Sequence, residues 1–207
     1  MSTLDKLIAY FETFPGVGAR QARRFAFYLL TRHEAERAEL ASLINQLQGT
    51  VHECASCHRF FSSSTPSQTP LCPICRDGAR DRPRLLVVAH DSDIQAIERA
   101  GMYTGLYFVL GGTVPLLSDT TPDTLRGGHL REVVRSRLAE GLTEVILGFS
   151  INPDGENTAG FVRSLLEPLQ TTHTFTISHL GRGLSTGSEL EYADAETIKN
   201  ALRNCFT

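Results

Sequence analysis

The sequence contains no long apolar run, since its hydrophobic stretches all fall short of the roughly 18 residues that a membrane helix needs. A signal-peptide pattern is also missing, because Asp5, Lys6 and Glu12 interrupt the apolar residues at the start of the chain. We therefore expect a cytoplasmic protein without membrane contact. The 207 residues, 41% of them hydrophobic, suit one medium domain or two small ones that share a core.

Lysine is scarce, with only Lys6 and Lys199, and the chain lacks an overall positive charge. The formal net charge of −3 divides into +3 for residues 1–84 and −6 for residues 85–207. This balance excludes a generally basic protein, so any nucleic-acid contact must come from a local patch in the first half. Nearly all of the basic residues are arginines, whose planar fork of donors suits phosphate. An arginine-preferring genome would explain the same composition.

Only five cysteines occur, and four of them form two close pairs, Cys54-x2-Cys57 and Cys72-x2-Cys75. In a cytoplasmic chain such pairs indicate a metal more than disulfides. Two tight turns would bring four thiolates together as the tetrahedral ligands of one zinc ion. Because a catalytic zinc keeps an open position, this closed ligand set predicts a structural ion. A redox role is less favoured, since the two pairs are equivalent.

The residues around these cysteines are expected to add no ligand. Four thiolates already complete the site, so His52 and His58 are predicted to be solvated loop histidines. Cys205 is left over near the C-terminus, as a small apolar residue. The Ser/Thr/Pro-rich segment 62–70 predicts a flexible loop, and residues 81–83 a short linker.

The first fifty residues show helical spacing of apolar side chains over 3–13, 19–31 and 34–47. Pro15-Gly16-Val17-Gly18 separates the first two helices. Glycines let the backbone approach a phosphate, and the free N–H groups that begin a helix attract anions. The candidate DNA-binding residues are therefore Gly16, Gly18, Arg20, Arg23 and Arg24. The alternative is a plain helical corner with a solvated basic face.

From residue 84 onward, short apolar runs alternate with helical patterns. This alternation predicts a parallel-rich α/β sheet covered by helices on both faces. The expected strands are 85–89, 106–110, 144–149 and 172–178. The expected helices are 91–100, 130–139 and 158–169, followed by a final helix over 194–203.

The ends of two predicted strands are rich in acids, and this pattern resembles a Toprim domain. Enzymes with this fold hold Mg²⁺ through carboxylates that follow the first strand and a later strand. Here Ala89 stands where the first-strand glutamate is expected, and Ser150 and Asn152 stand where two later acids are expected. The remaining acids could gather Mg²⁺, but helix-capping and turn roles are favoured for Asp91, Asp93, Asp154 and Glu156.

The order of these parts resembles the RecR family of bacterial recombination mediators along essentially the whole chain. The most specific motifs are Phe14–Gly18 with Arg20 and Arg24, and the C-terminal run Gly181–Asp194. Further matching segments are Ala96–Arg99, Gly105–Gly112 and Glu144–Leu147. The gap between the cysteine pairs is longer than the family's usual one, which lengthens a loop without changing the ligands.

The resemblance implies a fold of four parts: a helix-hairpin-helix region (1–51), a four-cysteine zinc finger (52–80), a Toprim-like domain (81–180) and a C-terminal oligomerisation region (181–207). It also implies a homotetrameric ring that encircles single- or double-stranded DNA and is not an enzyme. Such a ring acts with RecO and RecF to load RecA onto DNA covered by single-strand-binding protein.

Two other functions remain as alternatives to this one. A Mg²⁺-dependent Toprim nuclease or primase-like enzyme would depend on the acids, which are depleted here. A zinc-dependent adaptor would bind partner proteins without touching DNA. Cleavage of DNA would identify the first of these, and a lack of any DNA binding would favour the second.

Overall fold

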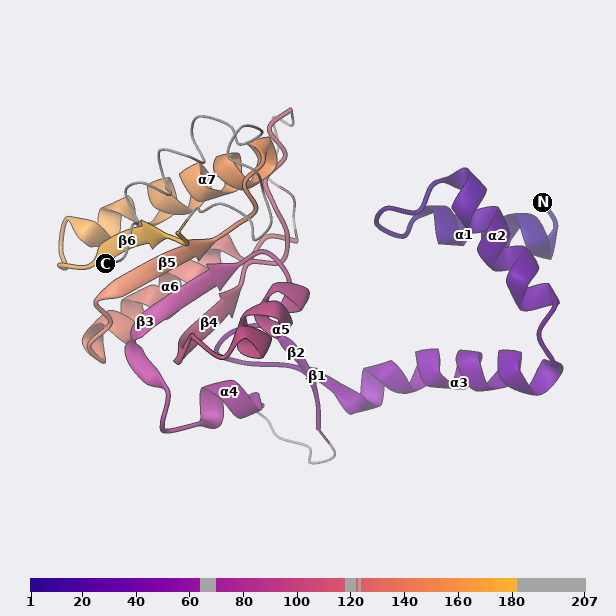
Figure 1. Cartoon of the computed structure of the whole chain (residues 1–207), viewed down its shortest axis with the longest axis horizontal. Helices are drawn as coiled ribbons and strands as arrows, with labels where there is room; N and C mark the ends of the chain where they lie inside the picture. The colour runs from indigo at the N-terminus through magenta and orange to yellow at the C-terminus, as the bar shows by residue number, and fades with distance from the viewer. Residues whose placement is uncertain (64–69, 118–121, 123, 182–207) are drawn as a thin grey trace, which may run out of the picture. The chain divides into compact units, whose positions relative to one another are not determined.

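The computed structural model describes residues 1–63, 70–117, 122 and 124–181, which form two compact units (Figure 1). The first unit spans Met1–His52 and also includes Ser62 and Ser63, and the second holds Glu53–Phe61 and the described residues from Pro70 onward. No helix within these ranges is long and apolar enough to cross a membrane. The predicted helix 194–203 and Cys205 lie outside the described residues, as does most of the polar segment 62–70.

The first unit consists of the three helices that the sequence predicts. They are α1 (Thr3–Glu12), α2 (Ala19–Leu30) and α3 (Glu34–Thr50). A capping box begins α1, where the Ser2 hydroxyl accepts the Asp5 amide at 3.2 Å and the Asp5 carboxylate accepts the Ser2 amide at 2.9 Å. The small side chains of Ala22 and Ala26 are fully buried, which lets α2 lie close against α1.

The second unit is built on a four-stranded sheet in which every strand is parallel to its neighbours. The strand order is β4 (Gly105–Val109), β3 (Asp81–Val88), β5 (Glu144–Gly148) and β6 (Thr176–His179). All four strands were predicted, and the parallel α/β class is confirmed. A separate two-stranded sheet of β1 (Val51–Glu53) and β2 (Phe60–Ser62) was not predicted, because each strand has only three residues.

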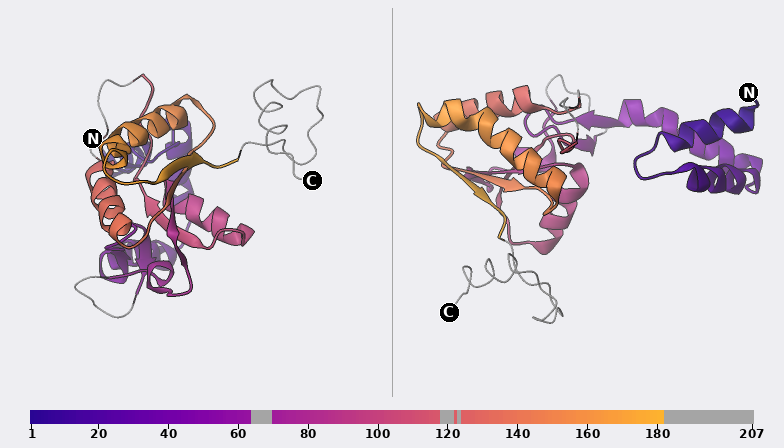
Figure 2. Two further views of the ribbon diagram at one scale, coloured as in Figure 1. Left: turned by 90° about the vertical axis from the view of Figure 1, so that its left-hand side faces the viewer. Right: turned by 90° about the horizontal axis from the view of Figure 1, so that it is seen from above.

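Helices cover both faces of the four-stranded sheet. The chain first steps from β3 to β4 through α5 (Asp91–Ala100), and then reverses direction through α6 (Gly127–Ala139) and α7 (Pro153–Gln170). Because crossovers between parallel strands are right-handed, the reversal places α5 on one face and α6 and α7 on the other. Figure 2 shows this arrangement, with α6 and α7 side by side.

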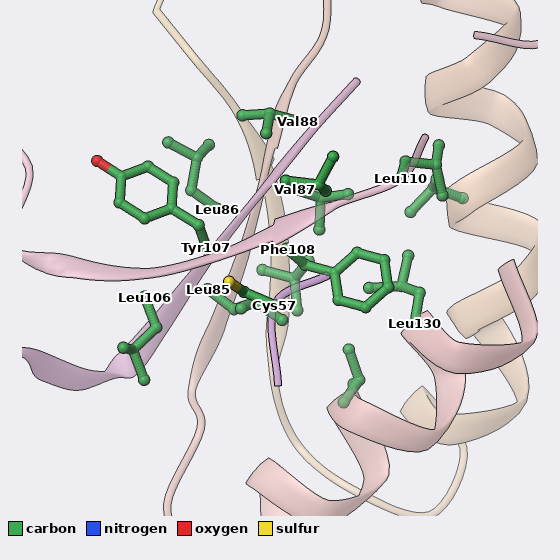
Figure 3. Packing of buried hydrophobic residues seen from close by; sticks show 14 of the residues in the cluster. Cys57, Leu85, Leu86, Val87, Val88, Leu106, Tyr107, Phe108, Leu110 and Leu130 are labelled. Atoms are coloured by element: carbon green, nitrogen blue, oxygen red, sulfur yellow. The ribbon is translucent and has the colours of Figure 1, made fainter. Parts of the chain in front are cut away.

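The core of the second unit surrounds the central strand β3. Leu85, Leu86, Val87 and Val88 are all fully buried, as a strand covered on both faces must be. Figure 3 shows these side chains packed with Tyr107 and Phe108 of β4, and with Leu130 of α6. Cys57 belongs to the same cluster, so the cysteine segment and the sheet share one core.

Several expected boundaries were wrong, since β6 begins at Thr176 rather than at 172 and α6 at Gly127 rather than at 130. The predicted linker Asp81–Pro83 is the start of β3, where the Pro83 carbonyl accepts the Thr143 amide at 2.9 Å. Proline is tolerated there because the register with β4 shifts between Asp81 and Leu85, as at a β-bulge. Helix α7 begins at Pro153 rather than at residue 158, because the Asn152 side chain caps it by accepting the Gly155 amide at 2.8 Å.

Candidate functional site

The four paired cysteines converge on one point in the second unit. Their sulfur atoms all lie within 4.8 Å of one another, and the Cys57 and Cys72 sulfurs are 3.6 Å apart. Zinc–sulfur bonds of about 2.3 Å require tetrahedral edges of about 3.8 Å, so these thiols fit the ion. The second pair is carried by α4 (Pro73–Arg76), a single helical turn in which the Cys75 amide donates to the Cys72 sulfur at 3.4 Å.

The chemistry of the four sulfurs also fits a cation. Hydrogen bonding with Cys57 holds the pKa of the Cys54 thiol far below its usual range, and the same contact with Cys54 raises the pKa of Cys57. Thiols packed this closely cannot all ionise alone, because like charges oppose one another. A divalent ion removes that conflict and allows four thiolates. None of the four forms a disulfide.

The cysteine segment also contacts the β4 edge of the four-stranded sheet and the helix that follows β3. The Val109 amide of β4 donates to the Cys57 carbonyl at 2.8 Å, and the Phe60 amide donates to the Asp91 carboxylate of α5 at 2.7 Å. The segment is therefore an integral part of the second unit.

His58 is not a solvated loop histidine, and that prediction was wrong. Its side chain is 15% exposed, and its Nδ1 lies 2.8 Å from the Glu53 carboxylate. The imidazole stacks on His129 at 4.8 Å and meets Phe108 edge-on at 5.3 Å. His58 also has a positive φ of 60°, which is costly for a side chain other than glycine. These contacts hold it in that turn, and they could not be read from local sequence.

The basic hairpin of the first unit is built by a tight turn between α1 and α2. The Val17 amide donates to the Phe14 carbonyl at 3.0 Å, and Gly16 has a φ of +74°. This is the position of a type II turn that requires a left-handed residue, with proline before it. Gly18 then caps α2 without a side chain, so no side-chain oxygen competes for the first amides of the helix.

The three candidate arginines lie on the first two turns of α2, and all are exposed. Arg20 and Arg24 are four residues apart, so they share a face of the helix, with Arg23 beside them. The Arg24 guanidinium donates only a long 3.4 Å hydrogen bond to Gln21. No ion pair involves these arginines within the described part of the chain. The hairpin therefore presents three unneutralised cations beside an uncapped helix start.

Comparison with known proteins matches the first unit, the Toprim-like region and the C-terminal region to described families. The family model for the RecR helix-hairpin-helix matches residues 4–47, a Toprim-domain model matches 84–180, and the model for the RecR C-terminal region matches 183–204. The hairpin arginines fall in the first match. The cysteine segment lies between the first and second matches.

Curated relatives match nearly the full length of the chain. Recombination protein RecR of Cereibacter sphaeroides is 38% identical over 97% of this chain and 94% of its own length. The chain belongs to the RecR family. The RecR proteins of Treponema denticola and Rhodopirellula baltica are 33% and 36% identical, over 98% and 96% of this chain and 97% and 94% of their own lengths. Family membership gives the chain a role in DNA recombination and repair.

Within this RecR chain, the Toprim acids serve as acceptors for backbone amides. Asp93 accepts the His90 amide at 2.8 Å at the start of α5, and Asp154 accepts the Leu116 amide at 2.9 Å. Asp91 accepts the Phe60 amide described above. Among the described residues, only one group of three or more histidine, cysteine, aspartate or glutamate side chains brings its ligand atoms close enough together to hold a metal ion. That group is the four cysteines. Asp91, Asp93 and Asp154 therefore have structural roles as hydrogen-bond acceptors.

One polar network of this RecR chain was not predicted. Arg80, just after the second cysteine pair, donates to Glu98 of α5 at 2.9 Å, and Tyr107 of β4 also donates to Glu98. The hydrogen bond from Arg80 lowers the pKa of Glu98. Burial is the main cause that raises the pKa of Tyr107, and the hydrogen bond to Glu98 raises it further. The three residues are 9 to 27 positions apart in the sequence, so no local pattern could have revealed the contact.

Proposed function

We propose that this RecR-family protein is a non-enzymatic recombination mediator that binds DNA without regard to sequence. In this role it acts as a clamp that, with RecO and RecF, helps to load RecA onto single-stranded DNA covered by single-strand-binding protein. The observation that supports the DNA contact is the cluster of three exposed, unpaired arginines beside the uncapped start of α2. Both features attract phosphate and neither reads a base.

The hairpin supplies two kinds of phosphate contact at one place. Gly18 leaves the first amides of α2 without a side-chain acceptor, and Arg20, Arg23 and Arg24 add mobile positive charge within two turns. Contacts of this type release condensed counterions, so binding weakens steeply as salt rises. We therefore expect Gly16 and Gly18 to matter through backbone shape, and the arginines through charge.

We assign one structural zinc ion per chain to Cys54, Cys57, Cys72 and Cys75. The close spacing of the four sulfurs supports this assignment. The ion, when bound, would neutralise the thiolates and hold both Cys-x2-Cys turns in place. The four regions expected from the sequence, 1–51, 52–80, 81–180 and 181–207, are proposed as hairpin, zinc finger, Toprim domain and oligomerisation region. The clamp itself is proposed to be a homotetramer, as the family resemblance implies.

Replacing Arg20 and Arg24 together with alanine tests the DNA contact. Each lost phosphate contact should lower the slope of log affinity against log salt by about 0.7–0.9, so the double variant should lose about 1.4–1.8. Fluorescence anisotropy with labelled single-stranded and duplex DNA at several salt concentrations measures this slope. The matched control replaces Arg131 and Arg135, two exposed arginines that are likewise four residues apart, on α6.

The control variant should keep the slope of the natural protein, because it removes the same charge from a different place. Equal slopes for the natural protein and the Arg20/Arg24 variant would remove the hairpin from the proposed function. Incubation of the protein with DNA and Mg²⁺ tests the non-enzymatic part. Cleavage that disappears in Asp154→Ala would replace the mediator with a Toprim nuclease.

A further inference from the structure

A cavity of about 350 Å³ lies between the cysteine segment and helix α6, entirely within the second unit. Its polar lining includes Ser56, which lies between Cys54 and Cys57, Arg82 at the start of β3, and Ser136 and Arg137 of α6. The volume falls in the range of sites for small molecules, which begins at about 300 Å³. The proposed DNA contact and the Toprim acids do not involve it.

Arg137 is the unusual residue of this cavity, because it is 92% buried yet has no acidic partner. Its exposed fraction is 8%, and its guanidinium donates one hydrogen bond, to the Ser56 hydroxyl at 2.8 Å. Across the described ranges, no carboxylate lies within ion-pair distance of it. A buried charge that lacks a counterion is costly, so an anion bound in the cavity would stabilise this guanidinium.

The cysteine sulfurs do not supply that anion directly. Cys75 lines the same cavity, but no hydrogen bond joins Arg137 to a sulfur among the contacts of the described residues. The side chain of Arg137 instead lines the cavity itself. Its planar fork is shaped to hold the two oxygens of a carboxylate.

The remaining walls indicate what an incoming anion would carry. Leu71, Leu106 and Val133 also line the cavity, so apolar side chains share its walls with the polar ones. Glu140 also lines the cavity, and its carboxylate lies 3.9 Å from the half-exposed Arg82. A carboxylate in the lining repels a doubly charged phosphate more than a singly charged group. The cavity therefore combines the buried guanidinium of Arg137, two serine hydroxyls and three apolar side chains.

We propose that this cavity binds a monovalent carboxylate attached to a short branched apolar group. The carboxylate would pair with Arg137 and accept from Ser56 or Ser136, while the branched group would lie against Leu106 and Val133. Such a ligand is either a free small acid or the C-terminal leucine or valine of a polypeptide.

The experiment uses isovalerate as the probe, with the full-length metal-bound protein and saturation-transfer NMR to measure its dissociation constant. Neutral isovaleramide has the same shape and should bind at least tenfold more weakly, because hydrogen bonds to charged groups contribute about 1.5–3 kcal/mol. Inorganic phosphate should compete poorly. Acetyl-Ala-Leu with a free carboxyl end, compared with its amide, distinguishes a polypeptide terminus from a free acid.

Three variants complete the test. Arg137→Gln should weaken isovalerate binding at least tenfold, and Arg135→Gln, an exposed arginine on the same helix, should leave it within twofold. Val133→Phe narrows the cavity while it keeps the Arg137 side chain, and it should also abolish binding. This variant keeps the test valid if Arg137→Gln does not fold. Zinc content and circular dichroism confirm that each variant is intact.

Equal binding of isovalerate and isovaleramide overturns the proposal, as does unchanged binding in Arg137→Gln. A natural protein that binds no isovalerate also overturns the proposal. If Arg137→Gln then loses zinc as well, the role of Arg137 is to offset the negative charge of the cysteine thiolates. None of these outcomes bears on the DNA contact, which is measured separately.

Discussion

The two glycines of the hairpin have different physical roles, although they stand two residues apart. Gly16 has a φ of +74°, which is strained for any residue with a side chain, so its role is in the turn itself. Gly18 has a φ of −84°, and a Cβ added there meets nothing within 4 Å. The fold therefore does not require glycine at 18, and a reason for it must be sought in what approaches the helix.

Replacing Gly18 with serine separates stability from DNA binding. Serine is a better N-cap than glycine, so unfolding of the first unit should be unchanged or harder by a few tenths of a kcal/mol. Its hydroxyl would accept the amides that the proposed phosphate contact needs, and DNA affinity should fall several-fold. Chemical denaturation and anisotropy measure the two effects.

Gly16→Ala provides the comparison for that variant. It should destabilise the hairpin by about 1–2 kcal/mol, because alanine must adopt the left-handed region. If Gly18→Ser binds DNA as well as the natural protein, the start of α2 does not approach phosphate. The arginines would then act through charge alone.

At the scale of elements, the cysteine segment packs against the sheet. Unfolding of this segment should therefore lower the stability of the whole second unit. The segment shares the core with β3 and β4, and its Cys57 carbonyl accepts the Val109 amide of β4. Removing zinc with a strong chelator, or Cys57→Ser, should destabilise the unit by several kcal/mol, since binding of a structural zinc is coupled to folding. Thermal denaturation and metal analysis measure this together.

Cys205→Ser is the control for metal removal, because Cys205 belongs to neither cysteine pair. It should keep one zinc per chain and the melting temperature of the natural protein. A Cys57→Ser protein that melts at the same temperature as Cys205→Ser would show that the two Cys-x2-Cys turns do not stabilise the sheet. Zinc would then stabilise the cysteine segment alone.

Glu98 of α5 connects β4 and the bend before β3, so its ionisation should contribute to stability. Arg80 lowers its pKa from the ordinary 4.5 in the folded chain, while the unfolded chain keeps the ordinary value. The contribution is therefore complete above about pH 5 and is lost as the pH falls through the lowered pKa. Glu98→Gln should cost about 1–3 kcal/mol near pH 7, and this difference should shrink toward pH 3.

Urea denaturation at several pH values measures that difference. Glu132→Gln on α6 is the control, because Glu132 is exposed and has no hydrogen bond or ion pair within the described chain. It should differ from the natural protein by less than about 0.5 kcal/mol at every pH. A constant cost for Glu98→Gln across the range would show that its charge is unimportant.

Local patterns predicted most elements, and long-range contacts explain the rest. Residues 85–89 and 91–100 could be placed because apolar runs and helical spacing are properties of neighbouring residues. The start of α7 was missed because Asn152 acts as a cap only when its side chain turns toward Gly155. His58 was misplaced for a related reason, since its partner His129 is 71 residues away.

The same division applies to the candidate site. The cysteine spacing predicted four ligands that the fold does bring together, because two short turns determine most of that geometry. The acids of the Toprim region were harder to interpret, since a carboxylate that caps a helix and one that binds a metal look alike in sequence. The burial of Arg137 without an acid depends on packing alone and leaves no local signal.

At the scale of the whole molecule, the first unit leaves many large apolar side chains exposed. On α3, Leu43, Ile44 and Leu47 are 54%, 58% and 56% exposed, and on α2 Phe27 and Tyr28 are 55% and 56% exposed. Monomeric proteins seldom present such a surface, which is typical of an interface with another chain. This surface supports the proposed homotetramer, in which copies of the chain would cover it.

Charging this surface should lower the mass of the assembly. The natural protein is expected to scatter light as four chains of 22.8 kDa each, and Leu43→Lys with Ile44→Lys should give smaller species, because buried lysines without partners are costly. Met102→Lys is the control, since Met102 is 88% exposed on the second unit. A natural protein with the mass of one chain, at the concentrations where it binds DNA, would rule out encirclement by a ring. In that case the arginine hairpin would have to hold DNA from one side.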